Sequence, residues 1–276
     1  MPGDHLGLAN ARGKGFFPED VRRAVIHGNP DRVIQQARLL DQPRLVARKR
    51  GFTTYTGKYE GVSVLISSTG MGSGSASIAM EELIQLGINL MIRVGTCGAY
   101  LKDAKPGDLF VPTSALVDGP ALRYLSPDYL HNWPPRDLPK WVSTRKGFVF
   151  VEGHREVSTL ITRLVNEELR SGRCQYSHTC FEGAVHDKDI LHAWRTEYSL
   201  KPSELERVRE QIRGLTVATD METGTLFTIS RMRKTVSGSL LTAVDFSADQ
   251  ESEAAQNEAL KIAYKTSLEV LARFVG

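Results

Sequence analysis

The sequence has few cysteines, no long apolar run and no run of lysine or arginine. Its three cysteines, Cys97, Cys174 and Cys180, have neither the paired spacing of a disulfide framework nor the spacing of a zinc site, which fits a reducing compartment. No apolar stretch approaches the length that crosses a bilayer. The N-terminal stretch MPGDHLGLANARGKG also lacks the apolar core of a secretory signal. We therefore expect a cytoplasmic protein with no membrane partner.

The charge balance excludes another class of protein. A net charge of only +3, with a pI near 8.7, gives no basic stripe of the kind that binds nucleic acid. Anionic small molecules are the partners that this balance leaves open. With 276 residues, of which 41% are hydrophobic, the chain can build one large α/β domain or two small ones.

Strand and helix patterns alternate along the chain and predict an α/β fold. Residues 62–95 have the order strand, loop, helix, strand that is typical of a parallel sheet. A β-hairpin is expected around Glu60–Gly61, and a helix is expected to begin at Pro30. Residues 126–147, rich in proline and tryptophan, are expected to form a long loop. No repeat or linker interrupts the pattern, so we predict a single domain over residues 1–276.

A glycine-rich stretch, STGMGSGS, stands between a predicted strand and a predicted helix, where a dinucleotide-binding fingerprint would stand. It has no clean G-x-G-x-x-G, and no acidic residue ends the next strand at the expected place. A bound dinucleotide is therefore disfavoured. We infer only that Gly70, Gly72 and Gly74 allow the backbone to pass close to a ligand.

Residues 91–100, MIRVGTCGAY, read as an apolar strand that carries one arginine and is followed by a Gly-Thr-Cys-Gly turn. An unpaired guanidinium in an apolar strand is costly, so Arg93 is expected to have an anionic partner. Arginine presents a planar fork of donors that matches phosphate. Gly28, Arg32 and Arg50 are the other candidates for an anion site.

Five segments resemble, in order and spacing, the nucleoside phosphorylase family, which includes uridine phosphorylases and hexameric purine nucleoside phosphorylases. They are HGNPDRV, RGFTTY, SSTGMGSGSASIAMEELIQLG, IRVGTCGAY and TDMETGTLF. The match is dense over residues 24–125, thin over 126–213 and present again from 214. The resemblance implies one α/β domain with a central mixed β-sheet flanked by helices, and dimers assembled into a hexamer. It also implies no cofactor, with nucleoside and inorganic phosphate as the substrates.

Carried over position by position, the resemblance assigns phosphate and ribose contacts. Met221 and Glu222 correspond to the residues that hold the ribose. The methionine packs on the sugar, and the carboxylate accepts hydrogen bonds from the 2′- and 3′-hydroxyls. Asp220 stands where family members often have Glu. His5 resembles a histidine that a neighbouring subunit lends to the ribose 5′-hydroxyl, although it lies in residues 1–20, which we expect to form an N-terminal arm. The phosphate positions are Gly28, Arg32, Arg93 and Thr96, with Arg50 reaching in from a neighbouring subunit.

The base is the point on which the two branches of the family differ. In the uridine phosphorylases that this chain resembles, a Gln-x-Arg pair binds the edge of uracil. The corresponding positions here lie near Arg195 and Glu197, and the pair is absent. Asp245 follows Glu222 by 23 residues, where purine enzymes carry an acid, and Cys97 and Gly98 also resemble the purine branch. The apolar strand before Asp245 is expected to bury it and raise its pKa, so that it protonates purine N7. Arg93, Glu222 and Asp245 are therefore the predicted catalytic residues, with a purine favoured and uridine left open.

A group of histidines and aspartates suggests a metal site, but its spacing fits no zinc pattern. We expect instead a mobile loop beside the base pocket, and no metal. Two further functions stay open: a hydrolytic nucleosidase, which would not need the arginines, and a non-catalytic nucleoside-binding relative. The group comprises His178, His186, Asp187, Asp189 and His192.

Overall fold

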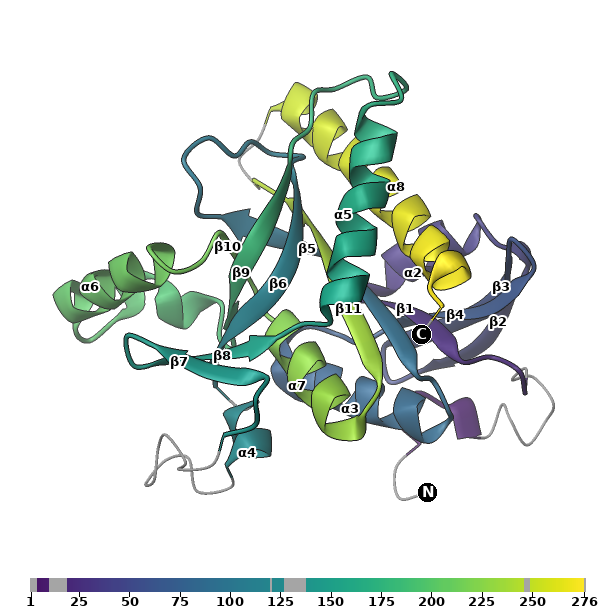
Figure 1. The fold of residues 1–276 in the computed structure, drawn as a ribbon, viewed down its shortest axis with the longest axis horizontal. Coiled ribbons are helices and arrows are strands. Elements are labelled where there is room, and N and C mark those ends of the chain that lie inside the picture. The colour runs from purple at the N-terminus through teal and green to yellow at the C-terminus, as the bar shows by residue number, and fades with distance from the viewer. Residues whose placement is uncertain (1–3, 10–18, 120, 127–137, 246–248, 276) are drawn as a thin grey trace.

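The computed structural model describes residues 4–9, 19–119, 121–126, 138–245 and 249–275. An eleven-stranded mixed sheet runs through the centre, in the order β2-β3-β4-β1-β5-β10-β9-β6-β8-β7, with β11 paired to β5 and β6 (Figure 1). The predicted α/β fold with a central mixed sheet is confirmed. The strands are β1 (Arg23–His27), β2 (Asp41–Lys49), β3 (Phe52–Tyr59), β4 (Val62–Ser68), β5 (Leu90–Ala99), β6 (Leu109–Asp118), β7 (Val142–Arg145), β8 (Phe148–Glu152), β9 (Cys180–Lys188), β10 (Ala218–Asp220) and β11 (Val236–Ala243).

Helices cover both faces of the sheet and enclose the two larger of three apolar cores in the described residues. On one face, α5 and α8 lie side by side and α2 packs close to them; on the other face lie α3 and α7 (Figure 1). None of the helices in the described part of the chain is long and apolar enough to span a membrane. The helices are α2 (Pro30–Ala37), α3 (Gly72–Gln85), α4 (Leu122–Leu125), α5 (Arg155–Leu169), α6 (Pro202–Arg213), α7 (Thr223–Arg233) and α8 (Gln250–Arg273), with the 3₁₀ turns η1 (His192–Trp194) and η2 (Thr196–Tyr198).

The central strand β5 shows how the two cores share one sheet. Successive side chains of a strand point to opposite faces. Ile92 and Val94 accordingly join the core under α2, α5 and α8, whereas Met91 joins the core under α3 and α7. The same alternation directs Arg93 toward the α3–α7 face.

The local turn and helix signals give the expected elements. Asn29 caps α2, because its side-chain oxygen accepts a hydrogen bond from the amide of Asp31 at 2.8 Å, and Pro30 opens the helix. Strands β3 and β4 form the predicted hairpin, with both Glu60 and Gly61 at positive φ. Strands β4 and β5 are parallel as predicted, and β1 lies between them.

Two expected loops are strands. The predicted Gly-Thr-Cys-Gly turn is wrong, because β5 continues to Ala99 and pairs with β11 as far as Cys97. Gly95 is needed for packing there, because a Cβ on it would clash with the guanidinium of Arg93. The long loop predicted over 126–147 contains β7, which pairs with β8, while residues 127–137 lie outside the described residues.

The described part of the predicted N-terminal arm packs on the domain. Leu6 and Leu8 are fully buried. The carboxylate of Glu82 on α3 accepts hydrogen bonds from the backbone amides of His5 and Leu6, at 2.8 and 2.9 Å. Residues 4–9 are thus held by one buried carboxylate and two apolar side chains.

Candidate active site

Arg93 lies at the centre of a buried cluster of charged side chains. Its Nη2 donates to Oε2 of Glu222 and lies 3.4 Å from Oδ2 of Asp220. The side chains of Arg93, Asp220 and Glu222 are 6%, 0% and 5% exposed. The partner that the sequence required for this arginine is therefore a pair of carboxylates, both from the TDMETGTLF segment.

The fold brings these residues together through strand pairing. The short strand β10 runs antiparallel to the end of β5 and parallel to β9, and it ends at Asp220. Glu222 follows as the residue before α7, and its Oε1 accepts a hydrogen bond from the amide of Gly72 at 2.6 Å. The glycine-rich loop thereby reaches the cluster through the backbone of Gly72.

Asp187 is a fourth member of the cluster, although its sequence pattern placed it with the nearby histidines and not with Arg93. It is the direct neighbour of Asp220 in the β9–β10 pairing and is 1% exposed. Its Oδ2 accepts a hydrogen bond from the amide of Thr225 at 2.8 Å, and the missing side chain of Gly224 leaves room for it. The signal that could have found Asp187 is its place at the carboxyl end of an apolar strand, where α/β sheets commonly bind ligands.

Three carboxylates thus surround one guanidinium in a buried site. Burial, reinforced by Asp220 and Glu222, raises the pKa of Asp187 well above its ordinary value. Burial also raises the pKa of Asp220, while Arg93 opposes that rise. Burial alone would lower the pKa of Arg93, but Glu222 and Asp220 outweigh it and raise that pKa. Asp187 is therefore the carboxyl group that most favours its protonated form.

A second cation, Arg32 of α2, and the buried His27 adjoin the cluster at the end of β1. Ile26 pairs with Arg93, so His27 and Gly28 follow directly beside it. Burial lowers the pKa of His27 to about 4, although Gln36 opposes this, and the charges of Arg32 and Arg93 lower it further. Burial lowers the pKa of Arg32 as well, and Arg93 adds to that effect. The charge of Arg93 therefore disfavours the charge of Arg32, and an anion bound between the two side chains would relieve that repulsion.

An unsatisfied donor and a close backbone approach point to the same conclusion. Within the described residues, Nη1 of Arg93 is buried and has no hydrogen-bond partner. A Cβ on Gly28 would lie 3.4 Å from the carbonyl oxygen of Gly70, so the two glycine loops approach each other closely here. A buried donor without a partner is costly, and an anion at this position would satisfy it.

The remaining predicted base and ribose residues lie around the ends of β5 and β10. Thr96 is half-buried on β5, opposite Thr242 of β11. Cys97 is buried, and burial raises the pKa of its thiol. Gly98 is exposed. Met221 is half-buried, and its methyl group lies near Gly72.

Arg50 and His5 do not join the cluster within this chain. Arg50 is exposed, at φ +52° in the turn between β2 and β3. Strand β2 is at the edge of the sheet, and β3, β4 and β1 lie between it and β5. His5 is half-buried, and its Nδ1 lies 2.6 Å from Oε1 of Glu82 in the same chain. Their roles across a subunit boundary stay predictions.

The predicted burial of Asp245 is wrong. Strand β11 ends at Ala243, and Asp245 is exposed beyond it. Its backbone amide donates to Oε1 of Gln256 at 3.3 Å. The chain leaves the sheet before Asp245, so the apolar strand does not enclose its carboxyl group.

The predicted mobile loop is also wrong for two of its members, because His186 and Asp187 lie within β9 and are buried. The ring of His186 lies 3.3 Å from the hydroxyl of Tyr100 and packs edge-on against Trp194. Nε2 of His178 lies 3.0 Å from the carboxylate of Glu258. No three His, Cys, Asp or Glu residues in the described ranges are arranged to hold a metal ion. Asp189, half-buried, and His192, exposed in η1, complete the set.

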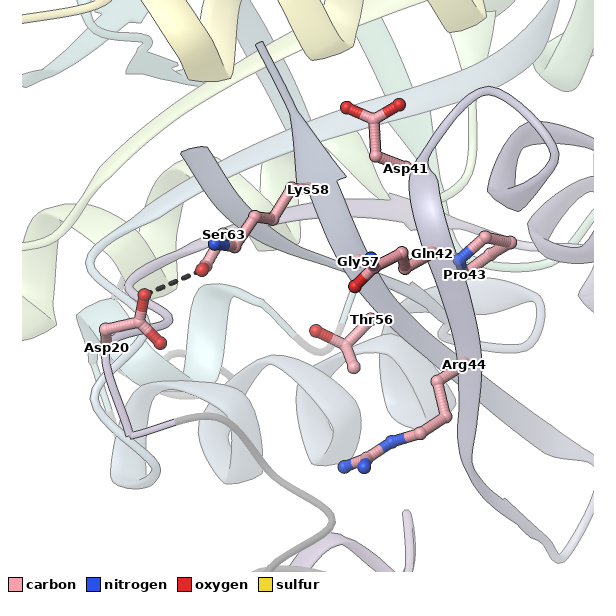
Figure 2. Close-up of a pocket in the computed structure, with 9 residues that line it drawn as sticks. All are labelled: Asp20, Asp41, Gln42, Pro43, Arg44, Thr56, Gly57, Lys58 and Ser63. Atoms are coloured by element: carbon pink, nitrogen blue, oxygen red, sulfur yellow. Dashed lines mark hydrogen bonds between the residues drawn. The ribbon is translucent and has the colours of Figure 1, made fainter. Parts of the chain in front are cut away.

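A large surface pocket lies away from this cluster. Figure 2 shows it, with a volume of about 650 Å³, where β2, β3 and β4 meet the segment before β1. A hydrogen bond of 2.6 Å from Ser63 to Asp20 closes one side of it. None of the residues that line it belongs to the Arg93 cluster, so cavity size does not locate the candidate active site. The lining residues are Asp20, Asp41, Gln42, Pro43, Arg44, Thr56, Gly57, Lys58 and Ser63.

Comparison with known proteins gives a family match over most of the chain. Residues 22–276 match the model of the phosphorylase superfamily. A uridine phosphorylase of Escherichia coli is 40% identical over 121 residues, which is 44% of this chain and 46% of the relative. A guanosine phosphorylase of Halorubrum lacusprofundi is 42% identical over 107 residues, 38% of this chain and 44% of the relative. The chain thus matches less than half the length of these curated relatives.

Solved structures extend the comparison to the whole fold. The uridine phosphorylase of Vibrio fischeri superposes with a TM-score of 0.70 at 26% identity, and 92% of each chain is covered. The purine nucleoside phosphorylase of Toxoplasma gondii superposes with a TM-score of 0.71 at 19% identity, covering 99% of this chain and 100% of the other. The second likeness concerns the fold alone.

Proposed function

The chain belongs to the phosphorylase superfamily, and on that premise we propose that it is a nucleoside phosphorylase. It cleaves the N-glycosidic bond of a nucleoside with inorganic phosphate and releases the free base and a ribose or deoxyribose 1-phosphate. The observation that carries the proposal is the buried contact of Arg93 with Glu222, beside Arg32 and the loop at Gly28.

In this proposal Arg93 and Arg32 hold the phosphate, with Gly28 and Thr96 completing the cradle. The buried, unpaired Nη1 of Arg93 is a donor that the phosphate can take without any other bond being broken. Holding the dianion at the sugar face opposite the base supplies much of the rate enhancement by positioning. Arg50 of a neighbouring subunit would add a third guanidinium.

Glu222 and Met221 hold the ribose. The carboxylate of Glu222 accepts hydrogen bonds from the ribose hydroxyls, while Met221 packs on the sugar beside the glycine-rich loop. As the bond from C1′ to the base nitrogen breaks, its electron pair leaves with the base and the ribose gains oxocarbenium character. Phosphate oxygen then forms the new bond to C1′, and both Glu222 and the phosphate favour the positive charge that develops there.

The preferred base is a purine in this proposal. Asp245 donates a proton to N7 of the leaving base, and Cys97 and Gly98 lie beside it. Because Asp245 is exposed in the single chain, the substrate or a neighbouring subunit must shield it before it can act as an acid at neutral pH. A homo-oligomer of dimers, a hexamer in all, would also bring Arg50 and His5 of one subunit to the site of the next.

Uridine is the second candidate substrate. It is favoured by relatives such as the 40%-identical protein of Escherichia coli, whose name is uridine phosphorylase. Hydrolysis by water and non-catalytic binding are weaker alternatives, since neither uses the cations at Arg32 and Arg93.

The test is a panel of inosine, guanosine, adenosine and uridine, each assayed with and without phosphate, with free base and pentose 1-phosphate measured together. We expect base release that requires phosphate and is fastest with a purine. Equal release in phosphate-free buffer would make the protein a hydrolase. Absence of turnover, with nucleoside binding retained in calorimetry, would make it a binding protein.

A further inference from the structure

A pocket of about 810 Å³ lies on the face of the sheet opposite the Arg93 cluster, where the end of α2 meets α8 and the end of β3. We propose that it is a second ligand site, for a small organic anion with an apolar body, and that its occupant alters phosphate binding. The part that concerns phosphate rests on the proposed function. The lining residues are Gln35, Arg38, Leu39, Tyr59, Asn257, Leu260, Lys261, Tyr264 and Lys265.

The charge of the lining selects an anion. It contains three cations and no acidic residue. Lys265 is engaged, because its Nζ lies 2.8 Å from Glu168 and 3.8 Å from Glu269. Arg38 and Lys261 form no ion pair with any residue that the structure describes, and both are exposed. Two exposed cations on one rim are complementary to a carboxylate, sulfonate or phosphate group.

The apolar part of the lining selects an organic body over an inorganic ion. Leu39 is 46% exposed, and Leu260 and Tyr59 are half-buried beside it. Tyr264 forms part of the floor and is 5% exposed. Ligand sites for small molecules combine such an apolar concavity with a few polar groups, at volumes of about 300–1,000 Å³.

Gln36 links the floor of the pocket by hydrogen bonds to His27, the residue that precedes Gly28 of the predicted phosphate site. Nε2 of Gln36 donates to the carbonyl oxygen of Tyr264 at 2.9 Å and to Oγ of Ser267 at 2.8 Å. Oε1 of the same amide lies 2.5 Å from Nε2 of His27, and the ring of His27 packs edge-on against the ring of Tyr264. His27 is fully buried and precedes Gly28.

The short helix α2 provides the second connection. It carries Arg32 in its first turn, and Arg38 follows its last residue. A helix of this length is about 12 Å long, so an anion held by Arg38 acts on the same rigid element that carries Arg32. The hydroxyl of Tyr264 also donates to Gln35 on α2 at 3.2 Å. A ligand that moves α2 or Tyr264 therefore moves the predicted phosphate cradle.

Direct binding tests the site without any assumption about the reaction. Naphthalene-1-sulfonate, as the anionic probe, and 1-naphthalenemethanol, as its neutral counterpart, are titrated by calorimetry in phosphate-free and nucleoside-free buffer. We expect the anion to bind and the double variant R38E/K261E to weaken it by at least about tenfold. The control K102E reverses an exposed charge outside the pocket and should leave binding unchanged. Equal affinity for the neutral probe, or for the double variant, would overturn the site.

Two further measurements complete the test. The Kd of inorganic phosphate, measured with and without saturating naphthalene-1-sulfonate, should change by several-fold in the wild type and not in R38E/K261E. An unchanged value would overturn the coupling while leaving the binding site intact. Sedimentation of wild type and R38E/K261E should give the same oligomer. Dissociation of the variant would show that a second copy covers this face, and that would overturn the ligand site. Failure of catalysis with binding intact would count only against the proposed phosphorylase activity.

Discussion

Replacement of Arg93 by methionine tests whether the buried cluster depends on its single cation. Arg93 contacts Glu222 and lies 3.4 Å from Asp220, and all three side chains are at most 6% exposed. The methionine would leave Asp187, Asp220 and Glu222 buried without a counter-charge. Breaking a buried ion pair by removing one partner costs about 3–5 kcal/mol, so the free energy of unfolding should fall by about that amount.

The second arm of the experiment is Glu222→Gln, alone and together with Arg93→Met. The new side-chain amide can still accept the hydrogen bond from Gly72, and Arg93 keeps Asp220 as its partner, so the single change should cost about 1–3 kcal/mol. In the double variant one buried carboxylate is already neutral when the cation is lost. Its cost should therefore be smaller than the sum of the single costs, by about 0.5–3 kcal/mol.

Urea unfolding followed by far-UV circular dichroism, at one fixed protein concentration and pH 7, gives these differences from the midpoints. The matched control is Arg233→Met, which removes an exposed arginine from its pair with the half-buried Glu81, whose nearest atoms lie 2.9 Å apart. It should cost about 1 kcal/mol or less. If Arg93→Met costs no more than Arg233→Met, or if the costs at Arg93 and Glu222 add without coupling, the buried cluster does not depend on its single cation.

Four further outcomes are expected. Arg93→Ala should raise the KM for phosphate and lower kcat, with a combined loss of about ten- to a hundred-fold from one charge-assisted contact; phosphate saturation as in the wild type would remove Arg93 from the cradle. Asp245→Asn should lower purine turnover by about a hundred-fold with little change in phosphate KM, and unaltered turnover would favour the uridine reading. Mixed subunits of inactive Arg50→Ala and inactive Glu222→Ala should regain activity after exchange if each site draws on two chains; no recovery after verified exchange would contradict sharing. Asp187→Asn should stabilise the fold, and more at pH 8 than at pH 4. The raised pKa of Asp187 means that its favourable contribution is complete below its ordinary value of 3.8 and is lost as pH rises through the folded-state pKa. The stability gained by Asp187→Asn is measured from urea unfolding midpoints at the two pH values. A gain that does not grow with pH would show that another group carries the raised pKa.

Short-range signals in the sequence predicted much of the fold. The Asn-Pro pair before α2, the hairpin turn at Glu60–Gly61 and the period change into α3 act over a few residues, and the structure places each element as expected. The error at residues 95–98 has a different origin. Whether these residues turn or continue as a strand depends on β11, since Cys97 pairs with Ala243, 243 − 97 = 146 positions further along the chain.

The residues of the candidate site also differ in whether the local sequence predicts their surroundings. Arg93 was predictable, because a guanidinium in an apolar strand requires a partner, and the structure supplies Glu222 and Asp220. The end of a strand marks Asp187 as a possible ligand residue, but its contact with the Arg93 cluster comes from its register with Asp220 across two parallel strands, which the local sequence does not show. The exposure of Asp245 depends on where the backbone leaves β11, which the apolar pattern does not mark.

The hydrogen bonds from Gln36 to α8 have a consequence for how the protein is made. The residues around His27 leave the ribosome early, whereas Tyr264, which holds Gln36 in place, is synthesised 228 residues after Gln36. Strands β1 and β5 must also wait for α8 to cover their apolar face. A nascent chain that stops short of α8 therefore exposes this core and cannot fix His27, so the domain completes its folding only after α8 has left the ribosome.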